Sequence, residues 1–271
     1  MSANTVTDLR REDVLREFNL YPLWQLRVAA SANEPTAEEA EITPVQDEMK
    51  PEQITSRQAV AIVNNEPDCS DLGWAELKKR VKACTACKLR AGCKQTVFGM
   101  GDEKADWLFV GSWPNEDDEA SGNPFAGQAG QLLDNMLAAI KLQRGVNVYL
   151  ANIVKCSGSI QQAPQKDEIA QCIPYLARQI QLLQPKIIVA LGHAAAANLL
   201  GEDRDWSSQP GKVHDYVCHA KDGSQQTTPL VITHHPAALL LAPLNKAQTW
   251  RDLCLARDTM LHLQAKDERT Q

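Results

Sequence analysis

The sequence lacks long apolar runs. No stretch of about eighteen consecutive apolar residues occurs in its 271 residues, so no transmembrane helix is predicted. Residues 1–11 are polar and do not contain the apolar core of a signal peptide. We therefore expect a cytoplasmic protein that has no membrane partner.

Aromatic residues are absent from one long segment, residues 29–69. This segment carries nine acidic and two basic side chains, which gives it a net charge of −7, and it contains several prolines. Such a composition cannot bury enough apolar surface to fold, so we predict a flexible acidic linker. An irregular arm packed on the rest of the chain is the alternative. The linker separates a short peptide, residues 1–28, from a body of residues 70–263 and a polar tail of residues 264–271.

Outside the linker the charges nearly balance. Residues 70–271 carry twenty-one acidic and twenty-two basic side chains, although the whole chain has a net charge of −6. The body therefore does not repel DNA through its net charge. Basic side chains gather near residues 78–94, and Lys88 and Arg90 are candidate contacts to DNA phosphates. A solvated helix face is the alternative.

The body alternates short apolar runs with segments of helical periodicity. The predicted strands are 107–110, 148–152, 187–191 and 231–233, and the predicted helices are 132–140, 169–183, 194–200 and 246–262. This alternation predicts an α/β fold, an α/β/α sandwich built on a four-stranded parallel sheet. Loops at the carboxyl ends of such strands usually build the functional site.

Cysteine is abundant, with eight residues in the chain. In a reducing compartment an organised subset of cysteines indicates a metal site rather than disulfides. Cys84 and Cys87 form a C-x-x-C pair, and Cys156 and Cys172 follow in the body. Four thiolates can hold a zinc ion or an iron-sulfur cluster, and spacing alone slightly favours zinc.

The motifs at the predicted strand ends resemble those of the family 4 uracil-DNA glycosylases. They lie in residues 111–127, 152–156 and 234–240, and the resemblance extends from about residue 74 to residue 261. It implies a [4Fe-4S] cluster in place of zinc. The implied ligands are Cys84, Cys87, Cys156 and Cys172, with Cys87 favoured over the nearby Cys93.

The resemblance also implies a pocket for a base flipped out of DNA. Phe125 would stack on the base, Asn152 would hydrogen-bond its polar edge, and His235 would stabilise negative charge on uracil. Leu239 and Leu240 would enter the vacated space in the DNA as an apolar wedge. Core packing, strand capping and an inner helix face are the corresponding structural alternatives.

The chain departs from this family at residues 111–115. Where the family has Gly-Glu-Ala-Pro-Gly, this chain has Gly-Ser-Trp-Pro-Asn, so Ser112 replaces a carboxylate, Trp113 replaces a methyl group and Asn115 ends the motif. Serine holds no fixed negative charge and is a poor base for water, and an indole is large enough to occupy the pocket. Residues 157–162 also lack the family's arginine. These departures predict a degenerate motif without catalysis, unless a carboxylate of residues 116–119 substitutes.

The N-terminal peptide is similar to the clamp-loader-binding segment of the psi subunit of bacterial DNA polymerase III. The similarity covers residues 11–27, and the partner-binding candidates are Leu20, Tyr21, Trp24 and Leu26. It implies contact with the clamp loader at the replication fork in the nucleoid. It also implies contact with the chi subunit and, through chi, with single-stranded-DNA-binding protein.

Two functions are therefore expected from the sequence. The first is a psi-like accessory subunit of the clamp-loader complex, with an inactive glycosylase fold that binds an iron-sulfur cluster and chi or DNA. The alternative is an active family 4 uracil-DNA glycosylase that excises uracil in base-excision repair.

Overall fold

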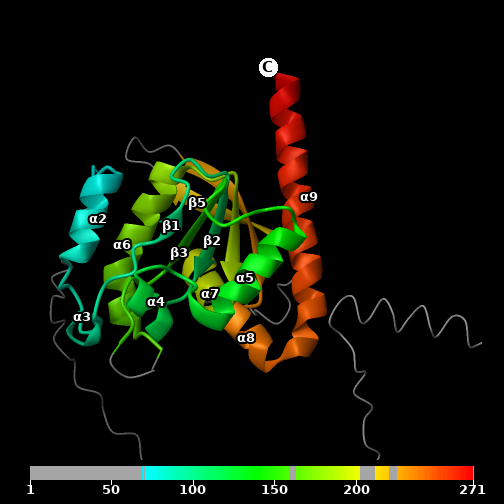
Figure 1. Ribbon diagram of the computed structural model, residues 1–271. Helices are drawn as coiled ribbons and strands as arrows, with labels where there is room; N and C mark the ends of the chain where they lie inside the picture. Colours follow the sequence, from blue (N-terminus) through cyan, green and yellow to red (C-terminus); the bar gives the residue numbers. More distant parts are fainter. Residues whose placement is uncertain (1–68, 70, 159–162, 202–210, 220–224, 271) are drawn as a thin grey trace, which may run out of the picture. The chain divides into compact units, whose positions relative to one another are not determined.

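The computed structural model describes most of the body (Figure 1). The described residues are 69, 71–158, 163–201, 211–219 and 225–270. The predicted psi-like peptide, with its partner-binding residues, and all of the predicted linker except Cys69 lie outside them. Within the described residues, no helix is long and apolar enough to cross a bilayer.

A sheet with the strand order β1-β3-β2-β4-β6-β5 forms the centre of the body. Its four inner strands run parallel, and they are β3 (Val148–Asn152), β2 (Trp107–Gly111), β4 (Ile187–Leu191) and β6 (Gln225–Thr233). Every residue of β2, β3 and β4 is buried, which is why these strands are continuous apolar runs in the sequence. The predicted α/β fold with four parallel strands is confirmed.

Two edge strands were missed by the sequence analysis. β1 (Met100–Gly101) pairs antiparallel with β3, and β5 (Val213–His219) pairs antiparallel with β6. Neither forms an apolar run, because an edge strand of an antiparallel pair exposes part of its surface. Val213 and Val217, for example, are both exposed.

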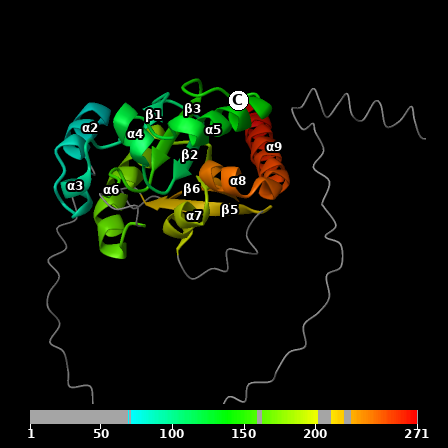
Figure 2. The same cartoon turned by 60° about the horizontal axis from the view of Figure 1, so that its bottom comes forward.

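Helices cover both faces of the sheet (Figures 1 and 2). One face packs against α2 (Trp74–Lys82), α3 (Leu89–Gly92), α6 (Lys166–Leu183) and α7 (His193–Leu200). The other packs against α5 (Gly127–Ala139), α8 (Pro236–Leu241) and α9 (Lys246–Thr270). Alternate residues of each strand enter the two cores, as the two-residue period of a strand requires.

Two short helices, α4 and η2, complete the body, and α9 is longer than predicted. α4 (Glu116–Ser121) follows β2, and the 3-10 helix η2 (Pro243–Asn245) joins α8 to α9. α9 continues to Thr270, past its predicted end at residue 262. The loops after β2, β3, β4 and β6 all emerge at the same edge, because these strands are parallel.

Candidate functional site

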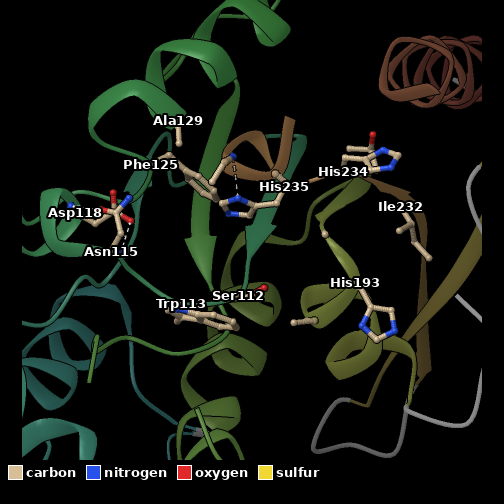
Figure 3. A pocket seen from close by; sticks show the side chains of 15 residues that line it. Ser112, Trp113, Asn115, Asp118, Phe125, Ala129, His193, Ile232, His234 and His235 are labelled. Carbon is tan, nitrogen blue, oxygen red and sulfur yellow. Dashed lines mark hydrogen bonds between the residues drawn. The ribbon is translucent and has the colours of Figure 1, made fainter. Parts of the chain in front are cut away.

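A cavity of about 650 Å³ lies at the carboxyl ends of the parallel strands (Figure 3). Residues that follow three strands line it, and they are Ser112 and Trp113 after β2, Gly192 and His193 after β4, and His234 and His235 after β6. Asn115, Asp118 and Phe125 complete the wall on the side of α4 and α5. The topology thus gathers into one pocket residues that are far apart in the sequence.

Asn152 ends β3 behind this wall, and its side-chain amide has no partner. The residue is 1% exposed, and neither the amide nitrogen nor the amide oxygen has a hydrogen-bond partner among the described residues. An unsatisfied buried polar group typically costs about 1–3 kcal/mol. Its backbone, in contrast, is fixed, because the Lys155 ammonium donates to the Asn152 carbonyl at 2.7 Å. Asn152 itself does not line the cavity, but its amide oxygen lies close to the ring of Phe125, which does.

Gly111 places Asn152 next to Phe125. A methyl group on Gly111 would meet the amide oxygen of Asn152 on one side and the Cζ atom of Phe125, at 2.6 Å, on the other. Only a residue without a side chain leaves room for both groups. The sequence analysis predicted Phe125 and Asn152 as pocket residues but gave Gly111 no role.

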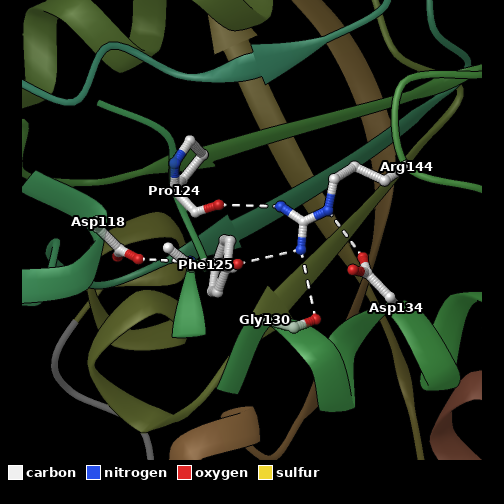
Figure 4. Close-up of polar contacts among 7 residues, drawn as sticks. Asp118, Pro124, Phe125, Gly130, Asp134 and Arg144 are labelled. Atoms are coloured by element: carbon white, nitrogen blue, oxygen red, sulfur yellow. Dashed lines mark hydrogen bonds and ion pairs between the residues drawn. The ribbon is translucent and has the colours of Figure 1, made fainter. Parts of the chain in front are cut away.

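The backbone of Phe125 is strained and clamped (Figure 4). Its φ of 56° lies in the left-handed region, which costs a residue other than glycine about 1–3 kcal/mol. The Arg144 guanidinium donates to the carbonyls of Pro124 at 3.0 Å and Phe125 at 3.1 Å. The Asp118 carboxylate accepts the backbone N–H of Ala126 at 2.6 Å. These contacts hold the buried phenyl ring at the cavity despite the strain.

His235 presents one nitrogen to the pocket in a defined state. Its Nδ1 atom accepts the backbone N–H of Ala237 at 3.2 Å, so the neutral ring carries its proton on Nε2. Burial lowers the pKa of this imidazole to about 4, so it is neutral at pH 7. Its ring centroid lies 5.7 Å from that of Phe125. The structure therefore places the ring of Phe125 close to both the Asn152 amide and His235, and His235 offers a neutral N–H donor.

The burial of His235 predicts a dependence of stability on pH. The pKa is about 4 in the folded chain and 6.5 for an ordinary histidine, so the unfolded chain binds the proton first. Stability from this group is complete above about pH 6.5 and is lost as the pH falls toward 4, by up to about 3 kcal/mol. Urea unfolding at pH 7 and at pH 4 measures it. We expect His235→Gln to lose less stability than the unmodified chain between these pH values, and an equal loss would contradict the prediction.

Asp118 supplies the carboxylate of the cavity wall. It is 3% exposed, and its second carboxylate oxygen accepts the N–H of Asn115 at 3.2 Å. Burial raises the pKa of this carboxyl above its usual value, while the backbone N–H donors act in the opposite direction. Among the described residues that line the cavity, Asp118 is the only acid. Ser112, from the motif in which this chain departs from the family, lines the same cavity.

Two predicted features of the pocket need correction. Trp113 does not fill the pocket, because it stands in the wall of an open cavity with 38% of its surface exposed. Leu239 is 1% exposed and packs in the core, so the wedge prediction is wrong for this residue. Leu240 is 42% exposed, and the next residue, Leu241, is 89% exposed.

The two predicted basic contacts differ in their surroundings. Lys88 is exposed, in agreement with a surface role. Arg90 is partly buried, and its guanidinium donates to the carbonyl of Cys93 at 2.7 Å. Arg90 therefore helps to hold the loop that carries the first cysteines, and only part of it faces solvent.

The four predicted ligand cysteines line one small internal cavity. Cys84 and Cys87 lie between α2 and α3, Cys156 follows β3, and Cys172 lies in α6. Cys93 lies near Cys156 but does not line this cavity. Within the described residues, no three cysteine, histidine or acidic side chains are placed to hold a metal ion, so the structure does not itself establish a metal centre.

The raised pKa values of these thiols fit a group of side chains that binds a metal cation. Burial raises the pKa of Cys156, and the neighbouring Cys93 and Cys172 raise it further. Burial likewise raises the pKa of Cys172 to about 11. Thiols gathered in this way ionise readily only when a positive metal compensates their charge.

A family model and several known proteins that are similar to this chain point to one family. The sequence model of the Uracil DNA glycosylase superfamily matches residues 98–256. The Type-4 uracil-DNA glycosylase of Pyrobaculum aerophilum is 33% identical over 180 residues, which cover 66% of this chain and 91% of that protein. The Type-4 uracil-DNA glycosylases of Archaeoglobus fulgidus and Sulfurisphaera tokodaii are 34% and 37% identical, over 62% of this chain and 83% and 76% of their own lengths.

These similarities overturn the first function expected from the sequence. Several relatives named as Type-4 uracil-DNA glycosylases match the body at 33–37% identity. This finding contradicts the prediction of an inactive psi-like accessory subunit. They favour the alternative, an active enzyme. The matched residues 98–256 do not include the N-terminal peptide, so its similarity to psi stays a prediction.

Proposed function

This chain belongs to the uracil DNA glycosylase superfamily, and we propose that it hydrolyses the bond between uracil and deoxyribose in DNA. The observation that carries the proposal is the buried amide of Asn152, which has no hydrogen-bond partner on either polar atom among the described residues. It stands beside the clamped ring of Phe125 and near the neutral His235. This combination fits a small planar base with polar groups along one edge.

Asn152 and Phe125 bind the base in this proposal. Uracil carries a ring N–H donor beside carbonyl acceptors, and a carboxamide offers an acceptor and donors on the same side. Binding therefore satisfies an amide that is unsatisfied in the free protein. Phe125 packs on the face of the base, and its strained, fixed backbone limits the ordering that binding requires.

His235 stabilises the leaving group. As the glycosidic bond breaks, its electron pair stays with uracil and negative charge spreads to the carbonyl oxygens of the base. The neutral imidazole donates its Nε2–H to that charge, because Nδ1 is already bonded to the N–H of Ala237. A single prearranged donor of this kind contributes about 100- to 1000-fold to a rate.

Asp118 provides the negative charge near the sugar that Ser112 does not. The sugar becomes positively charged when uracil departs, and water then adds to its anomeric carbon and releases a proton to solvent. An ionised carboxylate in the cavity wall favours this positive charge through space. Ser112 contributes a hydroxyl that can hydrogen-bond the water. Leu240 and Leu241, exposed beyond His235, provide the apolar surface that enters the vacated space in the DNA.

The cysteine cavity fits an iron-sulfur cluster as a structural group. Its sulfur donors are Cys84, Cys87, Cys156 and Cys172, which line one internal cavity and come from separate segments. When bound, the cluster supplies a cross-link between the first cysteine loop, the end of β3 and α6.

An excision assay on the iron-loaded protein tests this function. We expect release of uracil from single- and double-stranded oligonucleotides and no release from matched oligonucleotides that carry thymine. Asp118→Asn should lower the rate, because it removes the charge but keeps the size of the side chain. Asn198→Ala is the control, since this amide is bonded to the carbonyl of Ala194 within α7. Protein with confirmed iron and sulfide that releases no uracil would overturn the proposal.

A further inference from the structure

Trp113 stands in the cavity wall without a role in the chemistry proposed above. Its side chain is 38% exposed, and it belongs to neither core cluster. Among the described residues, no other aromatic ring stacks on its indole. A large apolar ring is thus presented to solvent within a binding pocket, where it is available to a ligand with a flat face.

The backbone around Trp113 is held firmly. The carbonyls of Gly111 and Ser112 accept the N–H groups of Ile153 at 2.9 Å and Val154 at 3.0 Å. On the other side, Pro114 is buried and the Asn115 side chain accepts the N–H of Asp118 at 2.8 Å. The indole therefore projects from a fixed support, so a ligand that stacks on it orders little additional chain.

The cavity has more room than one pyrimidine requires. Its volume of about 650 Å³ is in the range that encloses ligands much larger than a single small ring. Phe125 and His235 lie together in one part of the pocket, and Trp113 lies apart from them beside Ser112 (Figure 3). A base packed on Phe125 leaves the region beside Trp113 for another group.

We propose that Trp113 is a stacking platform for a second nucleobase, the neighbour of the flipped-out uracil on the same strand. The inference rests on the proposed function for the identity of the first base. Every nucleobase has a π-face, so such a platform binds DNA without reading its sequence. In a single strand the neighbouring base is free to stack on the indole, whereas in a duplex it stays paired and stacked in the helix. Trp113 therefore favours single-stranded DNA.

Binding of a uracil-free single-stranded oligonucleotide tests the platform without requiring excision. We expect Trp113→Ala to weaken this binding about 5- to 150-fold, which is the range for loss of one aromatic stacking contact. Trp113→Phe should retain most of the affinity. Trp250→Ala is the matched control, because Trp250 is 46% exposed on α9 and does not line the cavity. Thermal melting verifies that each variant is folded.

Salt dependence separates stacking from contacts to phosphate. Loss of a stacking contact lowers affinity by the same factor at every salt concentration, whereas loss of a phosphate contact changes the slope of affinity against salt. We expect Trp113→Ala to leave the slope unchanged. An altered slope, or affinity equal to that of the unmodified chain, would overturn the platform.

Excision kinetics distinguish this inference from the proposed function. We expect Trp113→Ala to raise KM on single-stranded uracil substrates more than on duplex substrates, with little change in kcat. Equal effects on both substrates would count against the platform while leaving the excision function intact. If the unmodified protein excises no uracil, the proposed function fails, and the oligonucleotide binding still decides the role of Trp113.

Discussion

Replacement of Asn152 by alanine is expected to lower uracil excision about 100-fold or more while leaving the fold as stable as before, or more stable by about 1 kcal/mol. The amide is 1% exposed and has no partner on either polar atom among the described residues. The folded chain therefore bears its desolvation cost without a compensating hydrogen bond. Alanine removes that cost together with the contacts to the base, so activity and stability should change in opposite directions.

Asn147 is the contrasting control for this prediction. Its amide oxygen accepts the N–H of Asp106 at 2.7 Å, its amide nitrogen donates to the Asp106 carboxylate at 3.3 Å, and its φ is 53°. Asn147→Ala loses both bonds and places alanine in a left-handed conformation, so it should destabilise the chain. Urea unfolding gives the stabilities, and excision well below the melting temperature gives the rates. A strongly destabilised Asn152→Ala would show that the amide has a structural partner instead of a ligand.

The inner part of the fold was accessible from sequence because its strands are buried on both faces. The runs that became β2, β3 and β4 are apolar except for Asn152 at the end of β3, and their lengths match the prediction closely. β5 was not recognised, because its sequence VHDYVCH mixes ionisable and apolar residues without a clear alternation. Edge strands are specified by their partner in space more than by a local pattern.

The site was predictable only where a residue type carried the chemistry. Phe125, Asn152 and His235 were named from their motifs, and the structure places them together. The clamp by Arg144 was missed, because it acts on the carbonyl of Pro124, far away in the sequence. Nothing in the local sequence around Arg144 indicates this contact.

The prediction of lost catalysis rested on several departures from the family, at Ser112, Trp113 and residues 157–162. Ser112 indeed replaces a carboxylate, but Asp118 brings another carboxylate to the wall of the same cavity. That convergence depends on the turn into α4, where Asn115 and Asp118 cap each other's backbone N–H groups. The sequence offered four carboxylates in residues 116–119 as substitutes, and the fold brings Asp118 to the cavity wall.

The second large effect is expected at the cysteine cavity. We predict that Cys156→Ala loses bound iron and sulfide and destabilises the chain by about 3–5 kcal/mol. The neighbouring Lys155 is 1% exposed, and among the described residues its ammonium donates to the neutral acceptors Asn152 and Gln179, at 2.7 and 2.6 Å. An ionised Cys172 would act on this ammonium as a compensating negative charge, and its sulfur already accepts the Lys155 backbone N–H at 3.3 Å. Loss of the cluster therefore leaves a buried cation without compensation.

Iron and sulfide analysis, visible absorption and urea unfolding together measure this effect. Cys218→Ala is the control, because Cys218 is buried in β5 and does not line the cysteine cavity. The Cys218→Ala variant should keep its iron, and its free energy of unfolding should fall only by the small contribution of one packed thiol. Cys87→Ala and Cys93→Ala then decide between the two candidate ligands of the first loop, since Cys87 lines the cavity and Cys93 does not. Iron lost from Cys93→Ala but retained in Cys87→Ala would transfer the ligand role to Cys93, and full iron content in Cys156→Ala would exclude Cys156 from the set.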